Sequence, residues 1–309
     1  MQPRPLHIAP LILRILLAVA FCVELTLGLA LRTHAQTQAS EKTQGSTKTQ
    51  AQQPPADVQE LANRLAPNLS RMHPIRVLVL DFKGPDNLWL PFSAWLADQF
   101  SAALGNVGKQ VEVVPRSKLT VAIAERNFKP KVAFDEKTAE ALAESLEAQV
   151  IVSGSFAAIQ NALGIALTYG EKEGDSWLIQ RGRDDLRGKI SLPSEVSDLF
   201  GITLDSLRPK DGIYQGGKGG IGFPACIRCP HPVYPIEASK KKAQGNVFLL
   251  ATISVEGRAT KIKVTKGAGF GFDQQAVKAV EGWEFKPAKD VDGNTVPVRQ
   301  TIEVTFHLY

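Results

Sequence analysis

The chain has 309 residues, of which 44% are hydrophobic and 22% are charged, and its net charge is +5 at pH 7. This composition is that of a globular protein, so it excludes a chain that is disordered throughout, and the length allows two domains. The segment from Arg208 onwards holds fifteen Lys and Arg against nine Asp and Glu. Nucleic acid needs a denser basic face with interleaved aromatic rings, so we expect no nucleic-acid partner.

Residues 1–35 have the layout of a secretory signal peptide. Basic residues precede the apolar run Ile15–Leu31, and a small-residue cleavage pattern ends at Ala35. The alternative is an uncleaved anchor, with residues 11–31 in the inner membrane, since the run is near the lower limit for a span. Glu24 inside the run favours cleavage, because a charged side chain at mid-membrane is costly. With either a cleaved signal peptide or an uncleaved anchor, we expect the rest of the chain to be exported.

Residues 36–56 are rich in Gln, Thr, Ser and Lys and have almost no large apolar side chain. Such a segment cannot bury enough apolar surface to offset the entropy of ordering, so we expect a disordered tether.

An α/β pattern fills residues 57–193. Nearly continuous apolar runs at 75–80 and 149–155 predict strands that are covered on both faces. Further elements are expected as helices after an Asp86 or Asn87 cap to about 104, at 117–125 and at 136–147, a short strand at 111–114, and weaker antiparallel strands within 163–192. Because strands alternate with helices, we expect a mixed sheet built from βαβ units.

Residues 194–223 are rich in Gly and Pro and predict a flexible linker. Within them, Gly212–Lys218 satisfies the G-x-x-x-x-G-K pattern of a phosphate-binding loop. The next residue is Gly219, so the hydroxyl that would bind Mg²⁺ is missing, and no apolar strand precedes the motif. We therefore interpret it as a chance match.

Residues 224–309 predict a small antiparallel sheet with one helix. Alternating apolar patterns indicate strands at 246–255, 259–266 and 295–308, and the apolar stripe of a helix follows Asp273, its expected N-cap. A helix lying on three strands buries both apolar faces, which leaves the last strand at an edge. The predicted fold class is thus an α/β module followed by a small α+β domain.

The landmarks of this C-terminal region carry a family resemblance. Tyr234-Pro235, the G-x-G-x-D-x-x-A-x-x-A-V run that begins at Gly269, Trp283-x-Phe285-x-Pro287-Ala288 and a final V-x-F-x-L follow one another. This order resembles the C-terminal domain of TonB-family energy transducers. The resemblance implies a non-enzymatic periplasmic protein without a cofactor, which acts in transmembrane transport by contacting outer-membrane transporters.

TonB-type domains pair an edge strand with an extended segment of the partner, so the resemblance implies a contact on the closing strand. The expected partner-binding residues are Val296, Val298, Gln300, Ile302, Val304 and Phe306. Trp283, Phe285 and Pro287 are expected to hold that strand by packing.

Energy coupling is where the resemblance weakens. The family's membrane helix carries a Ser and a His that engage an inner-membrane motor complex, and Ile15–Leu31 contains neither residue. The alternative function is therefore a periplasmic structural or assembly protein that binds partners without energy transfer. Residues 75–160 support a binding role, because V-L-x-F at 79–82 and V-P-R at 114–116 look like the N-terminal module of TolB-like envelope proteins.

Cys226 and Cys229 remain once the cysteine of the signal segment is set aside. We interpret this pair of cysteines as a local disulfide or simply as two thiols. A zinc site would need two more ligands, for which only His231 and His307 are near and without recognisable spacing. A thioredoxin-like centre needs a helix N-terminus, whereas prolines surround this pair. We expect neither a metal site nor redox catalysis.

The remaining motifs favour structural roles. Gly267-x-Gly269-x-Gly271 is expected to shape a strand-to-helix turn rather than bind a dinucleotide. Lys240–Lys242 is expected to be a solvated helix face, and Asp81 a cap or turn residue at the end of a buried strand. No catalytic constellation is present, so we expect no enzyme.

Overall fold

The structure is a computed structural model that describes residues 53–69, 74–126, 135–181 and 183–308. Residues from Gln53 onward form one compact unit. The predicted signal segment and nearly all of the predicted tether lie outside the described residues. Among the residues that are described, no helix has both the length and the apolar character needed to span a membrane.

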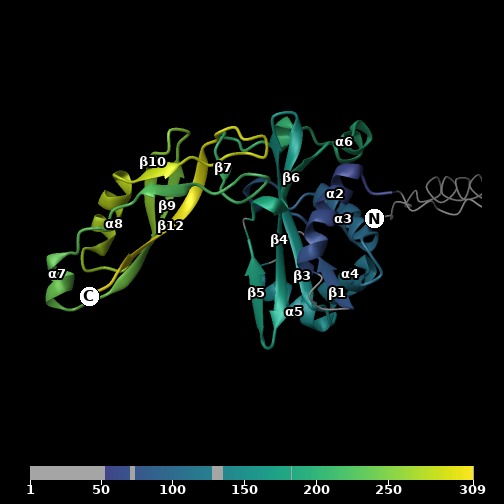
Figure 1. Cartoon of the computed structure of the whole chain (residues 1–309), viewed down its shortest axis with the longest axis horizontal. Helices are drawn as coiled ribbons and strands as arrows, with labels where there is room; N and C mark the ends of the chain where they lie inside the picture. The colour runs from purple at the N-terminus through teal and green to yellow at the C-terminus, as the bar shows by residue number, and fades with distance from the viewer. Residues whose placement is uncertain (1–52, 70–73, 127–134, 182, 309) are drawn as a thin grey trace, which may run out of the picture. The chain divides into compact units, whose positions relative to one another are not determined.

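The first part of the chain builds one six-stranded mixed sheet, in the order β2–β1–β3–β4–β5 with β6 also paired to β4 (Figure 1). The strands are β1 (Ile75–Val79), β2 (Val111–Val113), β3 (Val150–Ile159), β4 (Ala162–Glu173), β5 (Ser176–Gln180) and β6 (Arg187–Ile190). β1 runs parallel to β2 and β3, whereas β4 is antiparallel to β3, β5 and β6. The segment expected to hold weaker strands therefore contains the longest strand of this sheet.

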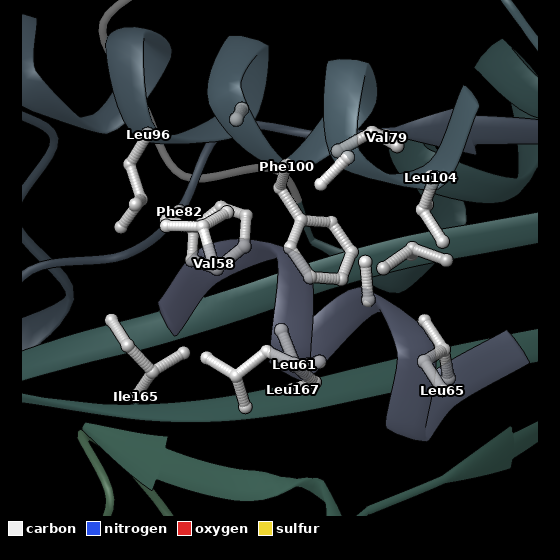
Figure 2. Packing of buried hydrophobic residues seen from close by; sticks show 14 of the residues in the cluster. Val58, Leu61, Leu65, Val79, Phe82, Leu96, Phe100, Leu104, Ile165 and Leu167 are labelled. Atoms are coloured by element: carbon white, nitrogen blue, oxygen red, sulfur yellow. The ribbon is translucent and has the colours of Figure 1, made fainter. Parts of the chain in front are cut away.

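Helices cover both faces of the parallel part of this sheet. They are α2 (Ala56–Leu69), α3 (Pro91–Gly105), α4 (Arg116–Glu125) and α5 (Glu136–Ser145). Val77 and Val79 of β1 pack in the cluster that contains α2 and α3, shown in part in Figure 2, while Leu78 packs with α4 and α5. The continuous apolar run of β1 is thus explained, since both of its faces are buried.

Two details of this module differ from the sequence-based expectation. α2 was not predicted, although its buried positions follow helical spacing. α3 begins at Pro91, because proline fixes φ at the first helical position and Ser93 Oγ accepts a hydrogen bond from the Leu90 N–H at 3.0 Å. Asp86 and Asn87 do not cap this helix: they have positive φ angles in the preceding 3-10 turn, Pro85–Asn87.

The C-terminal part forms a second sheet in the order β10–β9–β12–β7. Its elements are β7 (Tyr214–Gln215), β9 (Gly245–Ile253), β10 (Ala259–Lys266) and β12 (Val298–Phe306), with α8 (Phe272–Glu281) on one face. A separate two-stranded ribbon joins β8 (Ala225–Arg228) to β11 (Glu284–Lys286), and α6 (Ser194–Phe200) and α7 (Ile236–Lys240) are short helices. The sheet has one strand more than expected, because β7 comes from the segment interpreted as a linker.

The turn into α8 also differs from the expectation. Gly271, with φ at +79°, is the N-cap, and Asp273 lies inside the helix. The Asp273 carboxylate accepts a hydrogen bond from the Ala268 N–H at 2.9 Å, so it closes the glycine turn instead of capping the helix. Gly269 also has a positive φ, which confirms that these glycines shape a strand-to-helix turn.

Candidate functional site

The outer edge of β12 is open along most of its length. On its inner side β12 pairs with β9 at every residue from Val298 to Phe306, but on its outer side β7 pairs only with Val298 and Arg299. From Gln300 to Phe306 no strand of the described chain covers the outer side. An open edge carries unpaired backbone N–H and C=O groups and is a template for another strand.

The contacts of β7 show which residues turn their backbone toward the open side. The Tyr214 N–H donates to the Pro297 carbonyl at 3.0 Å and the Gly216 N–H donates to the Arg299 carbonyl at 3.2 Å. Since successive residues of a strand alternate in direction, the outward set continues beyond β7. It consists of Thr301, Glu303 and Thr305, whose side chains are exposed.

Most of the residues expected to bind the partner have side chains that are buried in the core. Val298, Ile302, Val304 and Phe306 are buried in the core under α8, while Val296 and Gln300 are half-buried and Val296 precedes β12. The family resemblance placed the contact on this strand, but the five apolar residues of the six mark the face that packs on the helix. The polar positions between them carry the outward backbone groups, and the same alternation contained that signal.

A cleft of about 520 Å³ lies beside the second half of this edge. Its walls are the residues Cys229–Pro232, Tyr234, Trp283 and Glu303–His307. The Trp283 indole N–H donates to the Pro230 carbonyl at 3.0 Å, and the Tyr234 ring lies edge-on to Phe306 at 6.1 Å between centroids. These contacts hold the proline-rich wall in place.

Cys226 and Cys229 form a disulfide in the structure, with the sulfurs 2.10 Å apart. Cys226 lies within the exposed strand β8, and Cys229, the residue after β8, lines the cleft. His231 and His307 both line this cleft, yet the described residues contain no group of three or more His, Cys, Asp or Glu that could hold a metal.

Comparison with known proteins identifies this region. Residues 230–308 match the family model described as Gram-negative bacterial TonB protein C-terminal. The protein tonB2 of Pseudomonas aeruginosa is 41% identical over 64 residues, which cover 20% of this chain and 24% of that protein. The C-terminal region is a TonB-type domain.

Two further proteins are similar to this chain. The TonB protein of P. aeruginosa is 29% identical over 102 residues, which cover 30% of this chain and 29% of that protein. The chain thus spans about a quarter of the length of the curated relatives it matches. A solution structure of the P. aeruginosa TonB C-terminal domain is 29% identical and covers 28% of this chain and 86% of that one, with a TM-score of 0.24.

The LpoB C-terminal domain from Salmonella enterica is also similar, at 16% identity over 44% of this chain and 96% of that one, with a TM-score of 0.36. The resemblance of residues 75–160 to TolB-like proteins stays a prediction.

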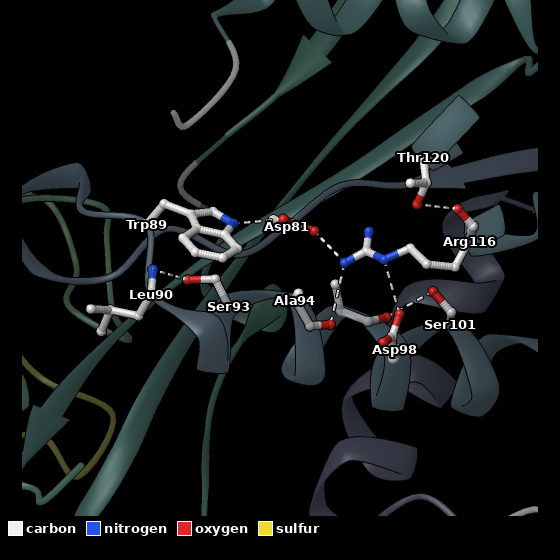
Figure 3. Close-up of polar contacts among 10 residues, drawn as sticks. Asp81, Trp89, Leu90, Ser93, Ala94, Asp98, Ser101, Arg116 and Thr120 are labelled. Atoms are coloured by element: carbon white, nitrogen blue, oxygen red, sulfur yellow. Dashed lines mark hydrogen bonds and ion pairs between the residues drawn. The ribbon is translucent and has the colours of Figure 1, made fainter. Parts of the chain in front are cut away.

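Outside the TonB-type domain, Asp81 has neither the cap nor the turn role expected for it. Its carboxylate accepts hydrogen bonds from the Trp89 indole at 2.6 Å and from the Arg116 guanidinium, which also pairs with Asp98 at 3.0 Å (Figure 3). Burial raises the pKa of Asp98, and the Arg116 charge opposes that shift. The network ties the end of β1 to α3 and α4, which is a structural role.

Proposed function

We propose that this chain is an exported envelope protein that acts in transmembrane transport by binding outer-membrane transporters. In this proposal, the TonB-type domain takes up a short extended segment of the transporter as an additional strand on β12. The open edge from Gln300 to Phe306 carries the proposal, because it offers unpaired backbone groups beside a cleft. The protein acts in this proposal through protein contact and not through catalysis.

The backbone groups of the edge and the cleft beside it contribute to partner binding in different ways. The backbone groups of Thr301, Glu303 and Thr305 supply hydrogen bonds that any extended segment can form, and these provide affinity. The cleft beside Glu303–His307 receives alternate side chains of the incoming strand, and it therefore sets specificity. The buried side chains of β12 pack in the core and thereby fix the position of the edge.

A proline at position 305 tests the strand pairing. Thr305→Pro removes one N–H that faces the open side and leaves the hydrogen bonds to β9 in place, which is why prolines are tolerated on edge strands. Thr305→Val is the matched control, since it keeps the N–H and a β-branched side chain. The readout is a photo-crosslinking residue at Thr301 in living cells, with the same residue at the exposed Lys263 of β10 as the positional control.

We expect Thr301 to cross-link an outer-membrane transporter, identified by mass spectrometry, and Lys263 not to do so. Thr305→Pro should remove most of the cross-link while Thr305→Val keeps it. Equal cross-linking in both variants, or a cross-linked product that contains no transporter, would contradict the proposal.

The alternative function is an envelope assembly protein without energy coupling. It is favoured by the apolar run Ile15–Leu31, which lacks the Ser and His through which TonB-family proteins engage an inner-membrane motor complex. Intact mass of the chain from soluble and membrane fractions separates the two. A soluble periplasmic chain that starts at Gln36 supports the assembly protein, whereas a full-length chain in the inner membrane supports energy transduction.

A further inference from the structure

The two edges of the C-terminal sheet differ in charge. β10 forms one edge of the sheet order and carries three exposed lysines, Lys261, Lys263 and Lys266. Repeated lysines on an edge strand oppose pairing with another chain. The open stretch of β12, from Gln300 to Phe306, carries a single charged side chain, Glu303, which is exposed. The β12 edge is therefore not guarded in the way that β10 is, and its one carboxylate is available for another role.

Glu303 is the one carboxylate of the cleft beside this edge. Among the described residues that line the cleft, none is Lys or Arg, and two are histidines, His231 and His307. The Glu303 carboxylate accepts a hydrogen bond from the Asn246 side-chain amide at 2.6 Å, which is a neutral donor. It forms no ion pair with any residue that the structure describes. The carboxylate thus keeps its charge for a cation from outside the chain.

The lysine across the sheet does not neutralise this charge. Glu303 and Lys266 lie in the strands on either side of β9, and each is directly opposite Phe248 in the pairing. The Lys266 ammonium lies over the Phe248 ring, 5.5 Å from its centroid. Phe248 therefore separates the ammonium from the Glu303 carboxylate.

The Glu303 side chain lies on the face of the sheet away from α8. Its neighbours Ile302 and Val304 are buried under α8, and successive side chains of a strand point to opposite faces. A residue directly opposite Glu303 in an added strand has its side chain on the same face, with the two Cβ atoms about 4.5–5.5 Å apart. Opposite charges in such a pair stabilise the sheet and like charges destabilise it. The favoured residue opposite Glu303 is therefore Lys or Arg.

The other face of an added strand meets an apolar wall. The cleft is lined there by four proline and aromatic side chains: Pro230, Pro232, Tyr234 and Trp283. The Tyr234 ring packs edge-on to Phe272, the first residue of α8, so this wall lies on the α8 side of the sheet. The residues that flank the Lys or Arg in an added strand turn to this side, because side chains alternate. Apolar side chains suit both positions.

We propose that Glu303 determines which segments the β12 edge accepts, by selecting a Lys or Arg directly opposite it between two apolar residues. This inference rests on the strand addition to β12 proposed above, and it adds the chemistry of the added strand. The backbone hydrogen bonds are common to all extended segments, whereas the ion pair with Glu303 distinguishes between segments of similar apolar character.

Random heptapeptides displayed on phage test this inference, because the open stretch from Gln300 to Phe306 has seven residues. They are panned against the chain from Gln36, which contains the whole compact unit that begins at Gln53. The same library is panned against Glu303→Lys. Glu256→Lys, in the exposed turn between β9 and β10, is the matched charge reversal away from the edge. Affinities of the enriched peptides for wild type and Thr305→Pro are then measured by fluorescence anisotropy.

Peptides that bind wild type and lose affinity for Thr305→Pro should carry Lys or Arg between apolar residues. Replacing that residue of the peptide by Glu should weaken binding about tenfold, as expected when an attractive cross-strand pair becomes a repulsive one. Glu303→Lys should enrich peptides with Asp or Glu at the same position, whereas Glu256→Lys should keep the wild-type preference. Glu303→Gln, which keeps an acceptor for Asn246, should lose the preference for charge, and melting temperatures show that each variant is folded.

Two kinds of result would contradict the inference. Peptides that depend on the Thr305 N–H but show no preference for Lys or Arg, or the same preference on folded Glu303→Lys and Glu303→Gln, would overturn the role of Glu303 and leave the strand addition in place. No enriched peptide, or peptides that bind wild type and Thr305→Pro equally, would overturn the strand addition and this inference with it.

Discussion

Arg116 and Asp81 form an ion pair that joins the first residue of α4 to the end of β1. The Asp81 side chain is only 17% exposed, and its carboxylate also accepts the Trp89 indole N–H. Removing the guanidinium leaves the Asp81 carboxylate poorly solvated, with the Trp89 indole as its remaining hydrogen-bond donor among these contacts. A buried charge that loses its partner destabilises the folded state.

We therefore expect Arg116→Met to lower the free energy of unfolding by about 2 kcal/mol, measured by urea denaturation. Lys118→Met, on the exposed side of the same helix, is the control and should change stability little. The double variant Arg116→Met with Asp81→Asn should cost less than the sum of the single changes, because the two groups are in contact. Strict additivity would show that the pair is not coupled.

Glycine substitutions test whether the loop Gly216–Gly220 packs on the sheet or is a flexible linker. A Cβ on Gly219 would lie 2.6 Å from the Ala157 Cβ, and the φ of Gly219 is +55°. Gly212 has a similar φ of +69°, but a Cβ there would meet no atom within 4 Å, so Gly212→Ala reports the backbone strain alone. Gly219→Ala should destabilise the protein by clearly more than the roughly 1–3 kcal/mol typical of such strain.

Equal destabilisation by the two glycine changes in thermal unfolding would mean that the loop is not packed on β3. That result would support the linker interpretation of residues 194–223.

The disulfide gives a prediction that is local to the TonB-type domain. Replacing Cys226 and Cys229 together by Ser opens a loop of a few residues, which by loop-closure entropy costs about 2 kcal/mol. The wild-type protein under reducing conditions should then have the stability of the double variant. Two titratable thiols in the unreduced folded protein would contradict the disulfide, and bound zinc in elemental analysis would support a metal site instead.

Asp135 gives a pH-dependent prediction. The Thr138 N–H donates to its carboxylate at 2.8 Å, and this hydrogen bond lowers the pKa of Asp135. A carboxyl whose pKa is lower in the folded state stabilises the protein above its unfolded pKa of about 3.9, and that stabilisation disappears as the pH falls through the folded pKa.

Asp135→Asn keeps the capping oxygen but cannot ionise. Wild type should therefore exceed Asp135→Asn in melting temperature by more at pH 6 than at pH 3, and the difference should shrink steadily on acidification. Thr120→Asn, a change to the same residue type on the exposed face of α4, should show no such trend. A difference that is constant with pH would exclude a contribution from this carboxylate.

The local elements and the C-terminal family could be predicted without coordinates. Strand β1, helices α4 and α5, and the order β9, β10, α8 and β12 could be predicted, because burial on one or two faces constrains each segment separately, whereas β11 was not predicted. The TonB resemblance rested on landmarks such as Tyr234 and Trp283, whose order along the chain needs no structure to be recognised.

The sequence placed the partner contact on the closing strand, but only the tertiary structure showed which part of that strand stays open. The pairing of Tyr214 with Val298 closes the first part of the β12 edge and thereby defines the part that stays open. A cleft in the α/β module is lined by both Lys83 and Lys218, which lie more than a hundred residues apart in the sequence. Both relationships join segments that are distant in the chain, and such contacts follow from strand order and loop docking, which local periodicity does not specify.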